Sequence, residues 1–130
     1  MVNGQKKKDN PIKDKSFAFA IQIVKVYKFL AFEKKEFVMS KQLLRSGTAI
    51  GALYREAEHA ESKADFIHKM AIAQKECNET LYWLELLLAA DYIEKEVFVS
   101  LHSDANELIS LITSIIRTSK GNGEWGMVNC

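Results

Sequence analysis

The chain has 130 residues, 48% of them hydrophobic and 27% charged, with a formal net charge of +1, which is typical of one globular domain and excludes a disordered chain. With one proline and six glycines, the chain lacks the regularly spaced turn residues that an all-β sandwich needs. Because no apolar run reaches the roughly 18 residues of a membrane span and the lysine-rich start lacks the apolar segment of a secretory signal, we expect a cytoplasmic protein.

Four helices are predicted over residues 14–32, 37–59, 63–90 and 95–120. Short connections make consecutive helices antiparallel neighbours, so the predicted fold is an all-α, up-down-up-down four-helix bundle. Ser62 and Asp65 fit a capping motif at the start of the third helix. Gly121 is expected to end the fourth. We predict that residues 1–13 form a flexible basic arm and residues 121–130 a flexible tail.

The helix over residues 14–32 is apolar almost all round, because two stripes follow the helical period. One stripe consists of Phe17, Ala20, Ile21, Val24 and Tyr27, and the other of Phe19, Ile23, Val26 and Leu30. In the third helix, Ile72, Trp83 and Leu86 also lie away from the expected core face. Left in water, such residues would form an exposed apolar patch. We therefore predict a homo-oligomer whose interface contains Phe19, Ile23, Val26, Leu30, Ile72, Trp83 and Leu86; the alternative is a wider core within one chain.

The helix over residues 37–59 is amphipathic in an unusual way. Its polar stripe carries Lys41, Arg45 and Arg55, so every charge on it is positive. Gly47 and Gly51 lie beside the apolar face, four residues apart. A glycine inside a helix costs about 1 kcal/mol, so this pair predicts the close approach of another backbone.

The charges of the chain are distributed unevenly. Residues 1–55 contain 12 Lys and Arg against 4 Asp and Glu, a net charge of +8, whereas residues 56–130 contain 6 against 13, a net charge of −7. This split fits a basic face for nucleic acid. It fits equally well an attraction between the two halves, within one chain or between subunits, or charges that are simply solvated.

The central part of the chain resembles a known family. The stretch carrying this resemblance is residues 42–52, QLLRSGTAIGA, and it continues through residues 56–57, 62–69 (SKADFIHK), 72–73, 75–76 and 78–84 (NETLYWL), with DKSF at residues 14–17 upstream. These segments are similar to a bacterial four-helix-bundle family whose founding members are encoded in intervening sequences of large-subunit ribosomal RNA genes. The accessory protein of diversity-generating retroelements is related to it. The resemblance covers roughly residues 10–120.

The resemblance implies a homopentamer of antiparallel bundles, and its retroelement branch implies binding to nucleic acid and to a reverse transcriptase. The chain departs from the commonest pattern at residues 53–55, where Leu-Tyr-Arg replaces Asn-Ile-Ala. Arg55 thereby extends the basic stripe.

No catalytic, cofactor or metal-binding set is predicted. Glu56 with His59, and Asp65 with His68, have the spacing of metal ligands in di-iron bundles, but both histidines face away from the expected core. Of the two cysteines, Cys77 is expected to be a buried apolar residue and Cys130 a free thiol in the tail.

We therefore expect a non-enzymatic scaffold that binds RNA or DNA phosphates through Lys41, Arg45 and Arg55, assisted by the lysines at positions 6–8. One alternative is a scaffold for a protein partner such as a reverse transcriptase, without direct nucleic-acid binding. In another, the basic stripe pairs with Glu76, Glu79 or Glu85 and has a structural role.

Overall fold

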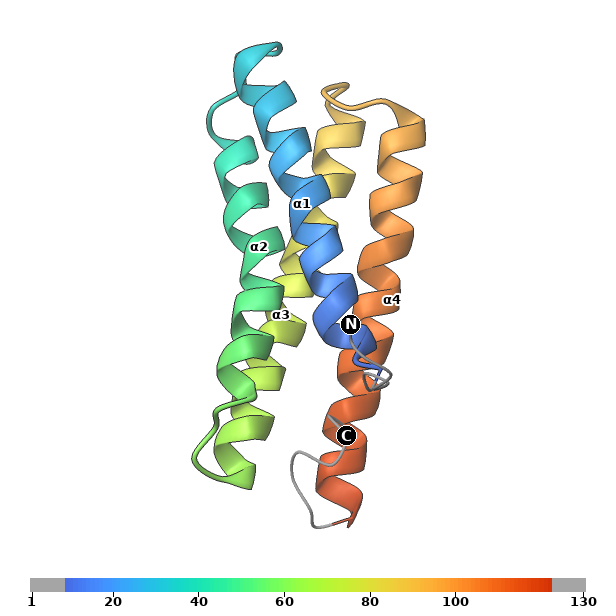
Figure 1. Cartoon of the computed structure of the whole chain (residues 1–130). Coiled ribbons are helices and arrows are strands. Elements are labelled where there is room, and N and C mark those ends of the chain that lie inside the picture. Colours follow the sequence, from blue (N-terminus) through green and yellow to red (C-terminus); the bar gives the residue numbers. More distant parts are fainter. Residues whose placement is uncertain (1–8, 123–130) are drawn as a thin grey trace, which may run out of the picture.

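The computed structural model describes residues 9–122, and these form four helices: α1 (Pro11–Phe32), α2 (Met39–Ala57), α3 (Lys63–Ala89) and α4 (Lys95–Asn122). Consecutive helices run antiparallel and pack side by side (Figure 1). The predicted all-α, up-down four-helix bundle is confirmed. In Figure 1, α1 lies between α2 and α4, and α4 extends past the first turn of α1.

The helix boundaries differ from the prediction where caps are involved. Residues 11–13 belong to α1 and not to a flexible arm, because proline suits the first helical turn and the Asn10 side chain accepts a hydrogen bond from Lys13 N at 3.3 Å. The fourth helix continues through Gly121, since an exposed glycine in a last turn costs only about 1 kcal/mol. Residues 1–8 and 123–130, with Lys6–Lys8 and Cys130, lie outside the described residues.

The second helix begins two residues later than predicted, because its cap comes from Glu36. The Glu36 carboxylate accepts hydrogen bonds from the backbone N–H groups of Val38, Met39 and Ser40 at 2.7–3.1 Å. Three N–H groups that have no partner within the helix are satisfied in this way. The helix ends at Ala57, where the chain tightens into a turn. At the start of α3, the predicted cap is confirmed, since Asp65 N donates to Ser62 Oγ at 3.0 Å.

The two glycines of α2 mark its close contact with α1, but the atoms that come closest belong to side chains and not, as predicted, to another backbone. A Cβ atom on Gly47 would lie 2.8 Å from the Ile23 side chain, and one on Gly51 would lie 3.2 Å from Ser16 Oγ. Real Cβ atoms essentially never make a contact as short as the first. The glycines therefore allow Ile23 and Ser16 of α1 to enter the surface of α2.

The core is a single apolar cluster along the axis of the bundle, with members from all four helices. Tyr54, which lies in the segment that departs from the commonest family pattern, is fully buried in it. Asn10 Nδ2 donates to the Tyr54 hydroxyl at 3.0 Å. Burial raises the pKa of Tyr54 to about 12, against the opposing effect of this hydrogen bond. Tyr54 thus connects α2 to the cap of α1.

Candidate nucleic-acid interface

The predicted basic stripe lies on the outward side of α2. Lys41, Arg45 and Arg55 are all exposed, while the opposite side of the helix contributes Leu43, Ile50 and other residues to the core. The helical period of the sequence therefore predicted correctly that these cations lie at the surface. Their surroundings differ, however, and this decides which of them could meet a ligand.

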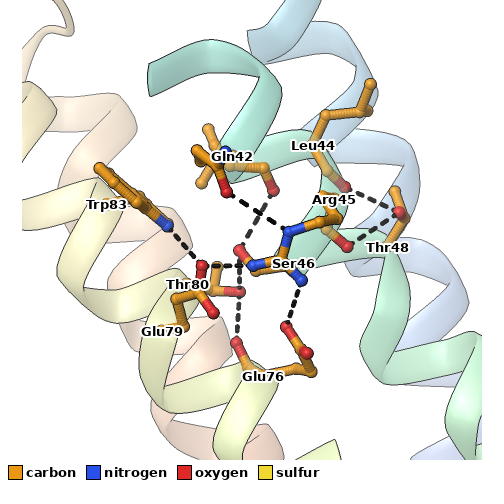
Figure 2. A network of polar contacts seen from close by, with 10 residues as sticks. Gln42, Leu44, Arg45, Ser46, Thr48, Glu76, Glu79, Thr80 and Trp83 are labelled. Atoms are coloured by element: carbon orange, nitrogen blue, oxygen red, sulfur yellow. Dashed lines mark hydrogen bonds and ion pairs between the residues drawn. The ribbon is translucent and has the colours of Figure 1, made fainter. Parts of the chain in front are cut away.

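Arg45 is occupied by two acidic residues of α3 (Figure 2). Its Nη1 atom lies 3.0 Å from Glu76 Oε1, and its Nη2 atom forms an ion pair with Glu79. Trp83 Nε1 donates to the same Glu79 carboxylate at 2.9 Å. Hydrogen bonding to Glu79 raises the pKa of Arg45, and the hydrogen bonds from Arg45 and Trp83 lower the pKa of Glu79. The structural role left open for the basic stripe is thus realised at Arg45, within one chain.

A buried polar contact lies beneath this ion pair. The hydroxyl groups of Ser46 and Thr80 hydrogen-bond to each other at 3.0 Å, and both side chains are fully buried. Together with Arg45, Glu76 and Glu79, they form a polar network between α2 and α3 (Figure 2). We assign Arg45 a structural position in this network.

The other two cations of the stripe remain at the surface. The Arg55 guanidinium lies 5.4 Å from the centroid of the Phe17 ring, a cation–π contact between α2 and α1. Within residues 9–122, neither Lys41 nor Arg55 forms an ion pair.

A larger group of cations surrounds the connection between α1 and α2. Lys28, Lys34, Lys35 and Lys41 are exposed, and none of them forms an ion pair with any residue of the described part of the chain. We call these four residues the basic corner. Of the two acidic residues in the connection, Glu36 is buried and its carboxylate caps α2, whereas Glu33 is exposed. Glu94 and Glu96 of the neighbouring α3–α4 end line a hollow with Phe29 of α1, but neither forms an ion pair with these lysines.

The sequence prediction included Lys41 but missed the other members of the basic corner. The available signal was the adjacent pair Lys34 and Lys35, which lies seven and six residues before Lys41 across a short connection. Helical periodicity does not group these lysines, because they belong to two different helices and to the connection between them.

The prediction for the oligomer interface needs a correction in α1. Phe19 is 2% exposed, and Ile23 and Leu30 are 0% exposed, so these three side chains fill the core of a single chain. The two stripes of α1 were assigned in the wrong order, because both have the same period and only the contact at Gly47 shows which one faces inward. Val26, Ile72, Trp83 and Leu86 are half-buried. The exposed apolar residues of α1 are Phe17, Ile21, Phe29 and Phe32.

An apolar groove of about 540 Å³ lies between α1 and α4. Its apolar lining consists of Val26, Phe29, Ile93, Val97 and Leu101, and its charged lining of Lys25, Glu94 and Glu96. A hollow of this size falls within the range of sites that bind small molecules or apolar side chains.

The cysteine and the histidines of the described residues are poorly placed for nucleophilic chemistry or for metal binding. Cys77 is fully buried, its Sγ lies 3.2 Å from the Ala105 carbonyl oxygen, and burial raises its pKa to about 12, so its thiolate is scarce at neutral pH. His59 and His68 are both exposed. Within residues 9–122, no group of three or more His, Cys, Asp or Glu side chains is placed to hold a metal ion, and no helix has the length and hydropathy of a membrane span.

Comparison with known proteins gives a consistent assignment. A family model described as "23S rRNA-intervening sequence protein" matches residues 8–114. A crystal structure of a protein of unknown function from the S23 ribosomal protein family of Bacteroides thetaiotaomicron VPI-5482 is 59% identical, with a TM-score of 0.81 over 82% of this chain and 98% of that chain. No curated protein matches. With a match over most of its length, the chain belongs to the 23S rRNA-intervening sequence protein family.

Proposed function

We propose that this protein is a non-enzymatic, homo-oligomeric scaffold that binds the phosphate backbone of RNA or DNA. The observation that carries the proposal is the basic corner, four exposed lysines without an ion-pair partner in residues 9–122. Lysines that form no ion pair are free to neutralise phosphates and to release the counterions of the nucleic acid. Membership in a family described by an rRNA intervening sequence is compatible with such a ligand.

The three cations of the basic stripe, Lys41, Arg45 and Arg55, have different roles in this proposal. Lys41 belongs to the basic corner and contacts phosphate directly, and Arg55 extends this surface along α2. Arg45 keeps its structural position and does not contact phosphate, because the carboxylates of Glu76 and Glu79 already neutralise its charge. Replacing Arg45 should therefore weaken binding less than replacing Lys41.

Assembly into a homo-oligomer would strengthen this surface. The exposed Phe17 and Ile21 of α1 provide apolar area for contacts between subunits, and the family resemblance implies five copies. Repeating the basic corner around a symmetry axis concentrates its positive potential. Light scattering coupled to size-exclusion chromatography measures the number of copies.

The test compares two triple variants that remove the same charge. Lys34, Lys35 and Lys41 are changed to Gln in one variant, and the exposed Lys75, Lys95 and Lys120 in the other. Binding of a labelled structured RNA is followed by fluorescence anisotropy at several salt concentrations. Because each lost phosphate contact lowers the salt dependence by about one unit of slope, the corner variant should lose roughly two to three units and the control variant should resemble the wild type.

Two results would contradict the proposal. One is the absence of RNA and DNA binding by the wild type even at low salt. The other is equal weakening in both triple variants, because net charge and not the basic corner would then explain the affinity. Thermal unfolding of all three proteins shows whether the variants remain folded.

A second candidate function rests on the groove between α1 and α4. Its apolar lining would suit side chains of a protein partner, such as a reverse transcriptase, with no direct contact to nucleic acid. Salt distinguishes the two functions, because phosphate contacts weaken steeply as salt rises whereas apolar docking does not. The change Val97→Asp in the groove should abolish partner binding in this second case and leave RNA binding intact in the first.

A further inference from the structure

The connection between α1 and α2 has a defined conformation. Lys35 adopts a left-handed backbone with φ of 57°, and Glu36 N donates to the Leu30 carbonyl oxygen at 2.9 Å, which closes the end of α1. The Glu36 carboxylate then caps α2. Burial raises the pKa of Glu36, but its hydrogen bonds to Met39, Ser40 and Val38 outweigh burial and hold the pKa below its ordinary value. The side chains of this connection are therefore displayed from a fixed backbone.

Two aromatic rings project from this connection into solvent. Phe32 is 62% exposed and Phe37 is 52% exposed. Neither ring takes part in a ring–ring or cation–π contact within the described part of the chain. The nearby Phe29 ring differs, because Lys34 Nζ lies 5.7 Å from its centroid. Phe32 and Phe37 thus remain available for a ligand.

Positive charge lies between the two rings along the chain, beside the exposed Glu33 and the buried Glu36. Lys34 and Lys35 lie between Phe32 and Phe37, and Lys41 follows in the first turn of α2. Proteins that bind single-stranded nucleic acid combine these two elements, since the bases stack on aromatic rings while cations follow the phosphates. The affinity for phosphate alone would not require exposed phenylalanines.

We infer that the basic corner, together with Phe32 and Phe37, binds single-stranded nucleic acid by stacking unpaired bases on the two rings. This inference rests on the proposed function and specifies its ligand. A duplex keeps its bases stacked inside, so it can use the lysines but not the rings. A second copy meeting this corner through its own basic corner would bring four more lysines to it, and like charges repel. A second copy meeting it through another face is an outcome that the number of copies, measured below, decides.

The test uses leucine to separate stacking from apolar contact. In Phe32→Leu/Phe37→Leu the apolar bulk remains, but the flat aromatic faces are lost. The probes are a labelled RNA single strand of about twelve nucleotides and a duplex of the same length. Because stacking contributes about 1–3 kcal/mol per base, we expect the variant to bind the single strand at least about tenfold more weakly. Its affinity for the duplex should stay within about twofold of the wild-type value, since lysines and phosphates are unchanged.

A matched control and a direct readout complete the experiment. Tyr82→Leu removes an exposed aromatic ring from α3 and should leave both affinities unchanged. A 2-aminopurine base in the single strand changes its fluorescence when it stacks, and this signal should be present with wild type and Tyr82→Leu but lost with the double variant. Light scattering shows whether the number of copies is preserved.

The possible results separate this inference from the proposed function. If the double variant binds the single strand as tightly as wild type, the inference is overturned while phosphate binding stands. A changed number of copies in the double variant overturns it as well, because the rings would then form a contact between copies. The inference is also overturned if the wild type binds phosphatidylserine vesicles more tightly than RNA and the double variant binds these vesicles as tightly as the wild type does. If wild type binds neither probe, the proposed function itself is wrong.

Discussion

The interface between α2 and α3 and the interface between α1 and α4 are built differently. Where α2 meets α3, a buried hydroxyl pair, Ser46 with Thr80, lies under an ion-paired arginine. Where α1 meets α4, Lys15 forms one exposed ion pair with Glu107 at 2.6 Å, and two hollows of about 540 and 190 Å³ remain along the contact. One interface is closed and the other is partly open.

This difference has a topological cause. Short connections tie α1 to α2, α2 to α3, and α3 to α4, whereas α1 and α4, the first and the last helix, are not joined by a connection and lie next to each other in the bundle (Figure 1). A charged residue at the closed interface, such as Arg45, is therefore part of the structure. The surfaces that we propose for other molecules lie at the open interface and at the exposed connection between α1 and α2.

The largest expected difference in the free energy of unfolding is between two Leu→Ala changes, one in each of the two regions. Leu43→Ala removes a fully buried side chain from α2, and Leu101→Ala removes one that lines the open groove. Because a buried Leu→Ala change costs about 2–5 kcal/mol and the cost rises with the cavity that remains, we expect Leu43→Ala near the upper end of this range. Leu101→Ala should cost about 2 kcal/mol, since the hollow is already present.

Urea unfolding followed by circular dichroism measures both changes in the free energy of unfolding. The slope of the transition checks that the variants unfold in the same way. A larger loss of stability for Leu101→Ala than for Leu43→Ala would mean that the groove is filled in solution, for example by contacts with another copy.

A smaller effect is expected at the two glycines of α2. Gly47→Ala gains about 1 kcal/mol of helix propensity, but its methyl group would lie 2.8 Å from the fully buried Ile23, and overpacking of this kind costs about 1–3 kcal/mol. We expect a net destabilisation of about 1 kcal/mol. Gly51→Ala meets Ser16 Oγ at 3.2 Å, which a small shift relieves, so its free energy of unfolding should change by less than about 0.5 kcal/mol.

The same denaturant titration compares the two variants. Equal destabilisation by both alanines would show that the approach of α1 is equally close at both positions. In that case, the spacing of the glycines would matter more than the individual contacts.

Much of the fold could be predicted from local patterns. The four helices and the Ser62 cap each depend on residues near one another in the sequence. The spacing of Gly47 and Gly51 indicated where another element comes close, although not that Ile23 and Ser16 of α1 are the residues that do so. The cap from Glu36 was missed because its carboxylate acts from outside the helix.

The candidate site was harder to predict, because it depends on what lies opposite each residue. The period of α1 allows either apolar stripe to face inward, and packing against α2 selects the one containing Ile23. For Arg45, the sequence offered pairing with Glu76 or Glu79 as one of several alternatives, and only the packing of α2 on α3 shows that this pairing is the one formed.

The smallest expected effect compares the ion pairs of the two interfaces. A double-mutant cycle of Arg45→Gln and Glu79→Gln measures the coupling between α2 and α3, and one of Lys15→Gln and Glu107→Gln measures the coupling between α1 and α4. Both pairs are partly exposed, so solvent screens them. We expect about 0.5–1 kcal/mol for the first pair, because a second carboxylate and Trp83 hold its geometry, and about 0–0.5 kcal/mol for the second.

The pH dependence of the first coupling provides an internal check. The pKa of Glu79 is lowered in the folded protein, so its contribution to stability is fully present above the unfolded pKa of about 4.3 and is lost as the pH falls through the lower folded value. The coupling of Arg45 and Glu79 should therefore be constant from about pH 6 to 7 and decline below about pH 4. If no coupling is measured at pH 7, Glu79 does not hold the charge of Arg45. That charge would then be available to phosphate, like the charge of Lys41, and Arg45 would belong to the proposed phosphate-binding surface.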